Sequence, residues 1–228
     1  MKHDFKTMAK SLNIDLNEKQ LKQFELYYQL LIEWNSKMNL TTIVDRDEVY
    51  EKHFIDSLCF TKAVSLTNQS ILDVGSGAGF PSIPLKIVFP ELKITIVDAL
   101  KKRITFLETL SKHLNLDITL HHERIEDFGK ENQYSIVTAR AVASLNVLAE
   151  LCIPFVKTSG VFIAMKTKNY NEEVQQALNA IATLGGKIQD TLEYKYLNND
   201  RSLIVVKKIN KTPDIYPRKF NKIKKSPL

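Results

Sequence analysis

Hydrophobic and polar positions follow two different periods along this chain. Up to about residue 68, apolar side chains recur every three or four positions, as on the buried face of an α-helix. One helix is expected to begin at Asn17, whose capping partner is Gln20, and a second helical stretch covers about 47–64. The buried face of the first helix comprises Leu21, Phe24, Tyr27, Tyr28, Leu31 and Trp34.

From about residue 69, short apolar runs typical of strands alternate with helical patterns. The expected strands are 70–74, 94–98, 118–121, 136–139 and 161–165, and the expected helices are 82–89, 101–114, 144–156 and 172–184. This alternation predicts a mostly parallel sheet with helices on both faces. Two more runs, 187–196 and 202–208, flank a turn-rich stretch at 198–200 and predict an antiparallel hairpin at one edge.

We therefore expect three zones. Residues 1–68 form an N-terminal helical extension, 69–209 an α/β core, and 210–228 a basic C-terminal tail that is extended and rich in Pro, Lys and Asn. With 228 residues, of which 44% are hydrophobic, the chain suits one large α/β domain or a core with a small appendage.

The net charge of +6 is concentrated near the C-terminus. Residues 207–228 carry eight basic side chains and one acidic side chain, a net +7, which leaves −1 for residues 1–206. A polyanion such as nucleic acid would be a natural partner for this end of the chain. A solvated segment that serves solubility explains the same charge equally well.

Several other classes of protein find no support. Cys59 and Cys152 lie far apart and are expected to be buried apolar residues. The histidines show no metal-ligand spacing, and neither a P-loop nor a G-x-S-x-G motif occurs. No apolar run approaches a membrane span of about 18 residues. We expect a cytoplasmic monomer without a bound metal. The five histidines are His3, His53, His113, His121 and His122.

The strongest local signal is a glycine-rich turn between an expected strand and an expected helix. Glycines occupy positions 75, 77 and 79, and Asp73 precedes them in the strand Ser70–Val74. Glycine permits a sharp turn and lets a ligand approach the backbone. A dinucleotide fingerprint would need glycine at Phe80, and Pro81 and Pro84 remove N–H donors that a diphosphate would use. The turn therefore favours S-adenosylmethionine over a dinucleotide.

Three further positions fit a nucleoside-binding site. Asp98 ends the second expected strand, where a carboxylate can accept hydrogen bonds from ribose hydroxyls. Ile125 and Glu126 follow the third strand, where an apolar residue and an acid can flank an adenine and accept from its amino group. Arg140 ends the fourth strand, on the side where such sheets present groups to a ligand.

Five motifs together resemble the bacterial small-subunit ribosomal RNA guanine-N7 methyltransferase G family, long called glucose-inhibited division protein B. The likeness runs from about Leu26 to the C-terminus. The motifs are Asn39-Leu-Thr-Thr, His53-Phe-Ile-Asp-Ser-Leu, Asp73-Val-Gly-Ser-Gly-Ala-Gly-Phe-Pro-Ser-Ile-Pro, Thr138-Ala-Arg-Ala-Val-Ala, and Tyr216-Pro-Arg-Lys with Lys225-Ser-Pro.

The resemblance implies a class I S-adenosylmethionine-dependent methyltransferase, with a Rossmann-like seven-stranded sheet that ends in an antiparallel hairpin. It implies methylation of N7 of one guanine in 16S ribosomal RNA, within the small ribosomal subunit. Family members often carry alanine where this chain has Ile125, and Phe220-Asn-Lys-Ile replaces a connection rich in Gly and Pro. The cofactor residues expected from the sequence and the resemblance are Asp73, Gly75, Ser76, Gly77, Gly79, Phe80, Asp98, Ile125, Glu126 and Arg140.

The chemistry needs little acid or base machinery, because guanine N7 already carries an unprotonated lone pair. We predict no general base; Arg140 and Lys166 are candidates for positioning the substrate, and RNA contacts are expected at Lys166, Arg201, Arg218 and Lys219. Lys166 could equally be an ordinary surface lysine. His53 and Asp56 could form a structural pair or line the substrate entrance. A nucleotide-dependent oxidoreductase and a non-catalytic RNA-binding module remain alternatives.

Overall fold

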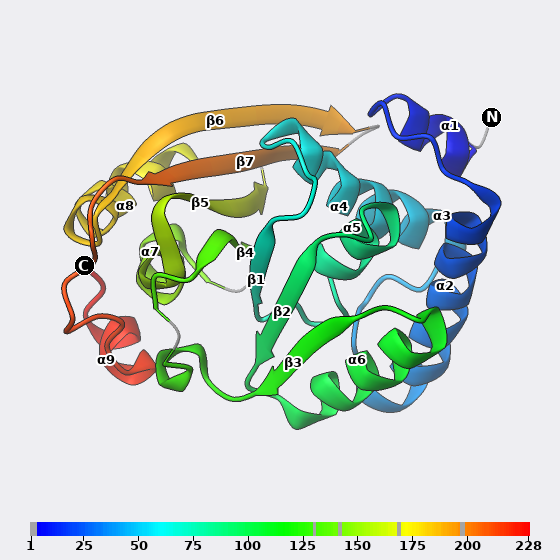
Figure 1. The fold of residues 1–228 in the computed structure, drawn as a ribbon, viewed down its shortest axis with the longest axis horizontal. Helices are drawn as coiled ribbons and strands as arrows, with labels where there is room; N and C mark the ends of the chain where they lie inside the picture. Colours follow the sequence, from blue (N-terminus) through cyan, green and yellow to red (C-terminus); the bar gives the residue numbers. More distant parts are fainter. Residues whose placement is uncertain (1–3, 130, 141–142, 168–169, 197–198) are drawn as a thin grey trace. The chain divides into compact units, whose positions relative to one another are not determined.

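The computed structural model describes residues 4–129, 131–140, 143–167, 170–196 and 199–228 (Figure 1). The chain divides into two compact units, of which the first comprises residues 1–69 with 76–122 and the second residues 70–75 with 123–228. The seven strands follow the order β3-β2-β1-β4-β5-β7-β6. Among the described residues, no helix is both long enough and apolar enough to span a bilayer.

The first unit holds the N-terminal helices and the second and third strands. Its elements are α1 (Phe5–Lys10), α2 (Glu18–Met38), α3 (Arg46–Val49), the π-helical turn η1 (Tyr50–Ile55), α4 (Asp56–Leu58), the 3₁₀ turn η2 (Cys59–Lys62), α5 (Ser82–Val88), β2 (Lys93–Asp98), α6 (Lys101–Leu114) and β3 (Ile118–His122).

The second unit holds the other five strands and the C-terminal helices. Its elements are β1 (Ser70–Val74), the 3₁₀ turn η3 (Ile125–Asp127), β4 (Tyr134–Arg140), α7 (Leu145–Cys152), the 3₁₀ turn η4 (Ile153–Phe155), β5 (Val156–Thr167), α8 (Asn171–Thr183), β6 (Gly186–Tyr196), β7 (Asn199–Lys208) and α9 (Phe220–Lys225).

Helix α2 organises the first unit. Asn17 and Gln20 form the expected capping box, in which each side chain accepts the other residue's backbone N–H at 2.9–3.0 Å. The Gln20 amide also donates to the carbonyl of Ile87 in α5 at 3.1 Å. One face of α2 then packs into an aromatic cluster, where Phe24 meets Phe5 at 4.8 Å and Phe54 at 5.0 Å between ring centres. The N-terminal helices therefore form one core with α5 and α6.

Strands β2 and β3 of the first unit pair in parallel, with Ile94 opposite Ile118 and Asp98 opposite His122. Helix α6 follows β2 and buries five apolar side chains at helical spacing. It ends at Leu114 and is capped by Asn115, which adopts the left-handed conformation that terminates many helices. This arrangement brings Asp98 to the carboxyl end of its strand, where ligands bind in sheets of this type.

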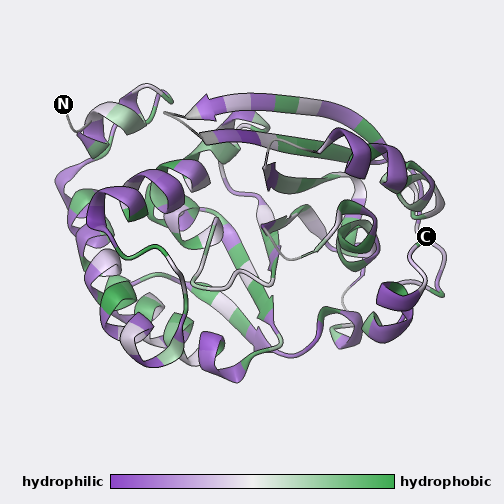
Figure 2. Cartoon of the chain, turned by 180° about the vertical axis from the view of Figure 1, so that it is seen from behind, coloured by the Kyte–Doolittle hydropathy of each residue, from purple (hydrophilic) through white to green (hydrophobic). Residues whose placement is uncertain are grey.

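The second unit combines parallel and antiparallel pairing. Strand β4 pairs in parallel with β1 and with β5, whereas β7 pairs antiparallel with both β5 and β6. The long β6–β7 hairpin confirms the antiparallel edge that the sequence predicts (Figure 1). Helix α7 is apolar along most of its length, whereas α9 is mainly hydrophilic (Figure 2).

Most elements predicted from the sequence agree with the structure, but several differ. The helix expected at 144–156 ends at Cys152 and is followed by η4 and, from Val156, by β5. Of the turn expected at 198–200, Asn199 and Asp200 lie in β7, and residue 198 lies outside the described residues. The stretch expected to be one helix over 47–64 is divided into α3, η1, α4 and η2, because a π-helical turn interrupts the regular hydrogen-bond ladder. The C-terminal tail is not extended throughout, since it forms α9 with Ile223 fully buried. The seven-stranded, mostly parallel sheet with an antiparallel hairpin confirms the expected fold class.

Candidate functional site

The glycine loop, Gly75–Phe80, makes the turn that its composition predicts. The backbone φ angles of Gly77 and Gly79 are +63° and +101°, in the region that side chains with a Cβ rarely adopt. The carbonyl of Ser76 accepts the N–H groups of Gly79 and Phe80 at 3.0 and 3.1 Å. These two donors are therefore committed to the turn itself, which disfavours a diphosphate ligand.

Two of the three glycines of the loop, Gly77 and Gly79, meet different surroundings. A Cβ at Gly79 would lie 2.6 Å from Ile83 Cγ1, 2.8 Å from Tyr27 Oη and 3.0 Å from Leu107 Cδ2. A Cβ at Gly77 would meet nothing within 4 Å. Packing of the protein itself therefore requires glycine at position 79, whereas Gly77 borders open space that a ligand could occupy.

Aromatic side chains of the helical region support the loop from within the first unit. The Tyr27 hydroxyl donates to the carbonyl of Ala78 at 2.5 Å, and its ring stacks on Phe80 at 5.4 Å. The His53 ring stacks on Phe80 at 4.5 Å, and its Nε2 lies 2.9 Å from the hydroxyl of Thr41. The N-terminal helices therefore hold the shape of the loop. The suggested pairing of His53 with Asp56 stays a prediction.

The polar groups in and after the loop fit a nucleoside ligand. The hydroxyls of Ser76 and Ser82 are buried, and within the described part of the chain neither has a hydrogen-bond partner. A buried hydroxyl without a partner costs free energy unless a ligand or water satisfies it. The loop thus offers uncharged hydrogen-bonding groups rather than cations.

Asp98 has the burial and geometry of a ligand-binding carboxylate. Its side chain is 2% exposed, Oδ1 accepts the N–H of Leu100 at 2.9 Å, and Oδ2 lies 3.2 Å from Arg103 Nη1. These contacts fix the carboxylate at the end of β2. Each oxygen accepts more than one hydrogen bond, so ribose hydroxyls could be added without breaking either contact.

The η3 turn holds the second group of expected cofactor residues, in the second unit. Ile125 is buried, and the side chain of Glu126 is 4% exposed. Glu126 Oε1 accepts the backbone N–H of Phe220 at 3.2 Å and lies 3.9 Å from Arg124 Nη1. Among the described residues, Oε2 of Glu126 has no hydrogen-bond partner, which leaves it available to an amino group.

One end of the second unit's sheet collects four of the residues singled out from the sequence. Asp73 pairs with Thr138, two residues before Arg140, and Arg140 pairs with Met165, the neighbour of Lys166. Across the antiparallel pair, Thr167 lies opposite Arg201. The pairing therefore brings Asp73, Arg140, Lys166 and Arg201 to the carboxyl end of the parallel strands, where ligands bind in such sheets.

The Lys166 side chain is committed to contacts within the second unit. It is 10% exposed, and its Nζ lies 2.6 Å from Glu173 Oε2 and 2.8 Å from the carbonyl of Ala143. Glu173 also accepts the N–H of Leu145 at 2.9 Å, at the start of α7. Lys166 thus positions the β5 end and α7, and a phosphate contact at Lys166 stays a prediction.

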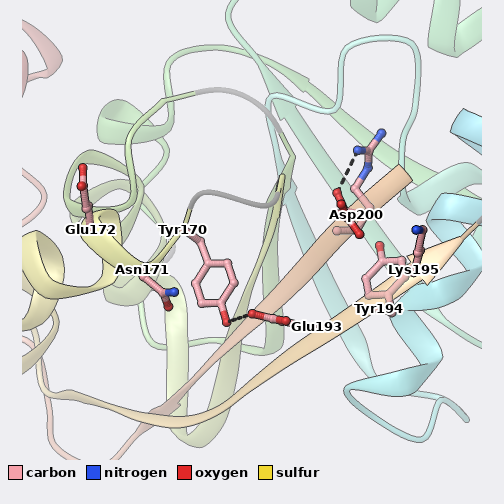
Figure 3. Close-up of a pocket in the computed structure, with 8 residues that line it drawn as sticks. Tyr170, Asn171, Glu172, Glu193, Tyr194, Lys195 and Asp200 are labelled. Atoms are coloured by element: carbon pink, nitrogen blue, oxygen red, sulfur yellow. Dashed lines mark hydrogen bonds between the residues drawn. The ribbon is translucent and has the colours of Figure 1, made fainter. Parts of the chain in front are cut away.

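A cavity of about 640 Å³ opens near the turn end of the β6–β7 hairpin and is lined in part by Arg201 (Figure 3). The Tyr170 hydroxyl donates to Glu193 at 2.6 Å, and this hydrogen bond raises the pKa of Tyr170. Arg201 Nη1 donates to the carbonyl of Asp200 at 3.2 Å. Tyrosines, acids and a guanidinium together suit a base with a polar edge, as in single-stranded RNA.

The C-terminal tail is anchored rather than free, which corrects the expectation of an extended tail. Arg218 donates through Nε and Nη2 to Glu150, at 2.7 and 2.6 Å, and its backbone N–H also donates to Glu150. Glu150 is fully buried, and the hydrogen bond with it raises the pKa of Arg218. Lys219 pairs with Asp127, which raises the pKa of Lys219. RNA contacts by Arg218 and Lys219 stay predictions.

Two acids that sequence reasoning overlooked prove to be organising residues. Glu150 is the one charged residue in the stretch Leu145–Cys152, and an acid in a largely buried helix signals a buried cation partner. Glu173 lies in the first turn of α8, where acids are common, so nothing marked it. Lys208 was counted with the basic residues of the C-terminus but is 1% exposed, because strand alternation turns it inward.

Neither thiol has the environment of a nucleophile. Burial and, secondarily, Asp56 raise the pKa of Cys59 to about 12, while burial followed by Asp73 raises that of Cys152 well above its ordinary value. Both cysteines are fully buried, as the sequence predicts. Within the described residues, no group of three His, Cys, Asp or Glu side chains could hold a metal ion.

Comparison with solved structures identifies the fold. TYW2 from M. jannaschii, solved in complex with AdoMet, has a TM-score of 0.56 and 15% identity over 68% of this chain and 77% of its own. The ribosomal protein L11 methylase from Lactobacillus delbrueckii has a TM-score of 0.53 and 15% identity over 70% and 80% of the two chains. The chain has the class I methyltransferase fold.

Comparison of sequences is more specific. The chain is 51% identical to the ribosomal RNA small subunit methyltransferase G of Staphylococcus saprophyticus, over 94% of this chain and 93% of the relative. It is 50% identical to that of Bacillus subtilis over 94% and 93% of the two chains. The family model described as "GidB: rRNA small subunit methyltransferase G" matches residues 20–204. With its fold and its glycine loop in agreement, the chain belongs to the rRNA small subunit methyltransferase G family.

Proposed function

We propose that this protein transfers a methyl group from S-adenosylmethionine to N7 of a guanine in small-subunit ribosomal RNA. The observation that carries the proposal is the glycine loop, which leaves Gly77 beside open space and holds an unsatisfied buried hydroxyl at Ser76. Membership of the family and names of relatives that are half identical support the same activity. A ribosomal substrate would put the reaction in the cytoplasm.

Different groups of the expected cofactor residues would contact different parts of the ligand. The glycine loop, with Asp73 before it, would border the amino acid part and the sulfonium. Asp98 would accept hydrogen bonds from the ribose hydroxyls, and the turn Ile125–Asp127 would flank the adenine, with Glu126 accepting from its amino group. When bound, S-adenosylmethionine supplies a sulfonium methyl that guanine N7 accepts with its lone pair, while the sulfur keeps the electrons of the broken bond.

The residues of the chain would then act by alignment. N7 needs no deprotonation, and the acids Asp73, Asp98 and Glu126 are assigned to binding. Holding the nucleophile and the methyl group in line accounts for several kcal/mol of barrier lowering. We therefore predict that no single acidic substitution abolishes turnover while leaving the affinities for cofactor and RNA intact.

RNA contacts are proposed at the carboxyl end of the second unit's sheet. Arg140 and Arg201 both lie at this end, and the cavity beside Arg201 offers tyrosine rings and the Glu193 carboxylate. The exposed cations of α9 add positive charge for the RNA backbone. Lys166 would assist by fixing the strand end, and its contact with phosphate stays a prediction.

The test is methyl transfer from labelled S-adenosylmethionine to small subunits that lack the modification and to naked 16S RNA. We expect labelled 7-methylguanosine at one position, identified by the mass of the product nucleoside. Asp98→Asn should weaken cofactor binding by about tenfold, as expected for the loss of charge-assisted hydrogen bonds. Asp117→Asn, a change at an exposed acid near the start of β3, is the matched control.

Cofactor binding without transfer to either RNA would exclude this substrate and leave the methyltransferase fold in place. RNA binding without cofactor binding would instead favour a non-catalytic RNA-binding module. Hydride transfer from a labelled nicotinamide nucleotide would support the oxidoreductase alternative. Each of these results contradicts the proposal in a different way.

A further inference from the structure

The C-terminal tail contacts the very turn that carries Glu126. Figure 1 draws α9 in red close to the short green turn of residues 125–127, both in the second unit. Phe220 donates its backbone N–H to Glu126 Oε1 at 3.2 Å, and Lys219 pairs with Asp127. The sequence separations are 94 and 92 residues, so nothing local in the sequence indicates these contacts.

The tail is itself fixed at a second point. Arg218 forms a two-pronged ion pair with the buried Glu150 of α7, the geometry in which an arginine–carboxylate pair is strongest. Arg218 Nη2 also donates to the carbonyl of Ser226 at 3.1 Å, which closes the tail on itself around α9. Ile223 of α9 is fully buried. The three residues Arg218, Lys219 and Phe220 therefore join α7 to η3.

The docked tail holds one oxygen of the Glu126 carboxylate in place. The backbone N–H of Phe220 donates to Oε1 of the carboxylate. The guanidinium of Arg124 lies 3.9 Å from Oε1 and 5.5 Å from the centre of the Phe220 ring. A carboxylate with one oxygen held by a backbone donor loses little further freedom when the other binds a ligand. Oε2 is the oxygen left for that ligand.

We propose that the C-terminal tail, through Arg218–Phe220, is a positioning element for cofactor binding that holds Glu126 ready to accept from the adenine amino group. This inference rests on the proposed function, because it assumes that Glu126 faces the adenine. It assigns the tail a role other than RNA attraction. It also explains why Arg218 and Lys219 are directed at acids of the same chain.

The experiment measures the affinity of the full chain for S-adenosylhomocysteine and for S-inosylhomocysteine by calorimetry. In the second ligand an oxygen replaces the adenine amino group, so it cannot donate to Glu126. The wild type should prefer the adenosine compound by about tenfold or more, and Glu126→Gln should reduce that preference. Arg218→Gln and Glu150→Gln should each reduce it as well, although neither residue touches the ligand.

The matched control is Lys224→Gln, which removes an exposed cation of α9 and should leave the preference unchanged. The double variant Arg218→Gln with Glu150→Gln should lose no more preference than either single variant, because both break one contact. All measurements are made where circular dichroism shows each variant folded, since a purely structural role would lower stability without altering the ratio of affinities.

The possible outcomes distinguish a failure of the proposed function from a failure of the role proposed for the tail. A wild-type chain that binds neither compound contradicts the proposed function itself. A wild type with a clear preference that Arg218→Gln and Glu150→Gln both retain overturns the role of the tail and leaves the proposed function intact. A preference that falls in both variants but not in Lys224→Gln supports the positioning role.

Discussion

The glycine loop is held by stacked aromatic rings and backbone hydrogen bonds within the turn, whereas the η3 turn is held by charged side chains and one backbone donor from the C-terminal tail. The rings of Tyr27 and His53 stack on Phe80 inside the first unit. Glu126 and Asp127 depend on Phe220 and Lys219 inside the second.

The difference has consequences for how each part responds to change. Close-packed side chains tolerate no added volume, because their atoms have no room to move, but their packing needs no charged group. Ionic docking tolerates changes of volume but depends on charge. The two groups of expected cofactor residues should therefore fail in different ways when they are perturbed, and the following predictions test that difference.

Gly79→Ala should have the largest effect. Its Cβ would meet Ile83, Tyr27 and Leu107 at 2.6 to 3.0 Å, and its backbone has a positive φ. Overpacking and backbone strain together predict a loss of about 4 kcal/mol in the free energy of unfolding, measured by urea denaturation. Gly77→Ala is the control: with no atom within 4 Å of its Cβ, only strain remains, at about 1 kcal/mol. Equal losses in the two variants would refute the packing argument.

Arg218→Ala should come next, because it leaves the carboxylate of Glu150 buried without its cation. Breaking a buried ion pair in this way predicts a loss of about 3 kcal/mol in the free energy of unfolding. Lys224→Ala, in the same tail, should change it by less than about 0.5 kcal/mol. If Arg218→Ala proved as mild as Lys224→Ala, the tail would not be anchored at α7.

Tyr27→Phe removes one hydroxyl and keeps the aromatic ring that stacks on Phe80. The buried carbonyl of Ala78 then loses its donor, which predicts a loss of about 1.5 kcal/mol in the free energy of unfolding. Tyr28→Phe, at a neighbouring exposed hydroxyl that donates to Val44, should have almost no effect. Similar values for Tyr27→Phe and Tyr28→Phe would show that aromatic stacking alone shapes the loop.

Lys208 anchors the start of the C-terminal tail through Thr212 and the carbonyl of Ile153, and the burial of its amine predicts that stability depends on pH. Burial lowers the pKa of Lys208 to about 8 from an ordinary value of 10.5. Between these values the unfolded chain keeps a proton that the folded chain has released. Stability should therefore rise with pH across this window, and the penalty for burying the charged amine is complete below pH 8.

The measurement compares the pH dependence of unfolding in the wild type and in Lys208→Met. The variant should lack the rise between about pH 8 and 10.5, whatever its absolute stability. Lys207→Met, at the neighbouring and more exposed lysine, should keep it. Parallel curves for all three proteins would mean that Lys208 is not desolvated in the folded chain.

Much of the molecule could be inferred from residue patterns, because the interactions concerned are local. The capping pair Asn17 and Gln20, the bounds of α6 at 101–114 and the positive φ at Gly77 depend on residues a few positions apart. The same is true of the strand ends that bring Asp98 and Arg140 to the carboxyl edge.

Other features depend on contacts between distant residues. Composition suggested an extended and solvated tail, but burial of Ile223 and the Glu150 partner of Arg218 order it as α9. The π-helical turn Tyr50–Ile55 similarly arises in an aromatic cluster with Phe5 and Phe24.

The sequence by itself determined the class of fold, the glycine loop and the family, since each depends on residue types at short and regular spacing. Only the tertiary structure decided which charges are exposed and which are paired. An ion pair is selected by which side chains meet after folding, and burial raises both the cost of an unpaired charge and the gain of a paired one. For this reason Lys166, Arg218 and Lys219 look alike in the sequence as surface cations but meet Glu173, Glu150 and Asp127 in the structure.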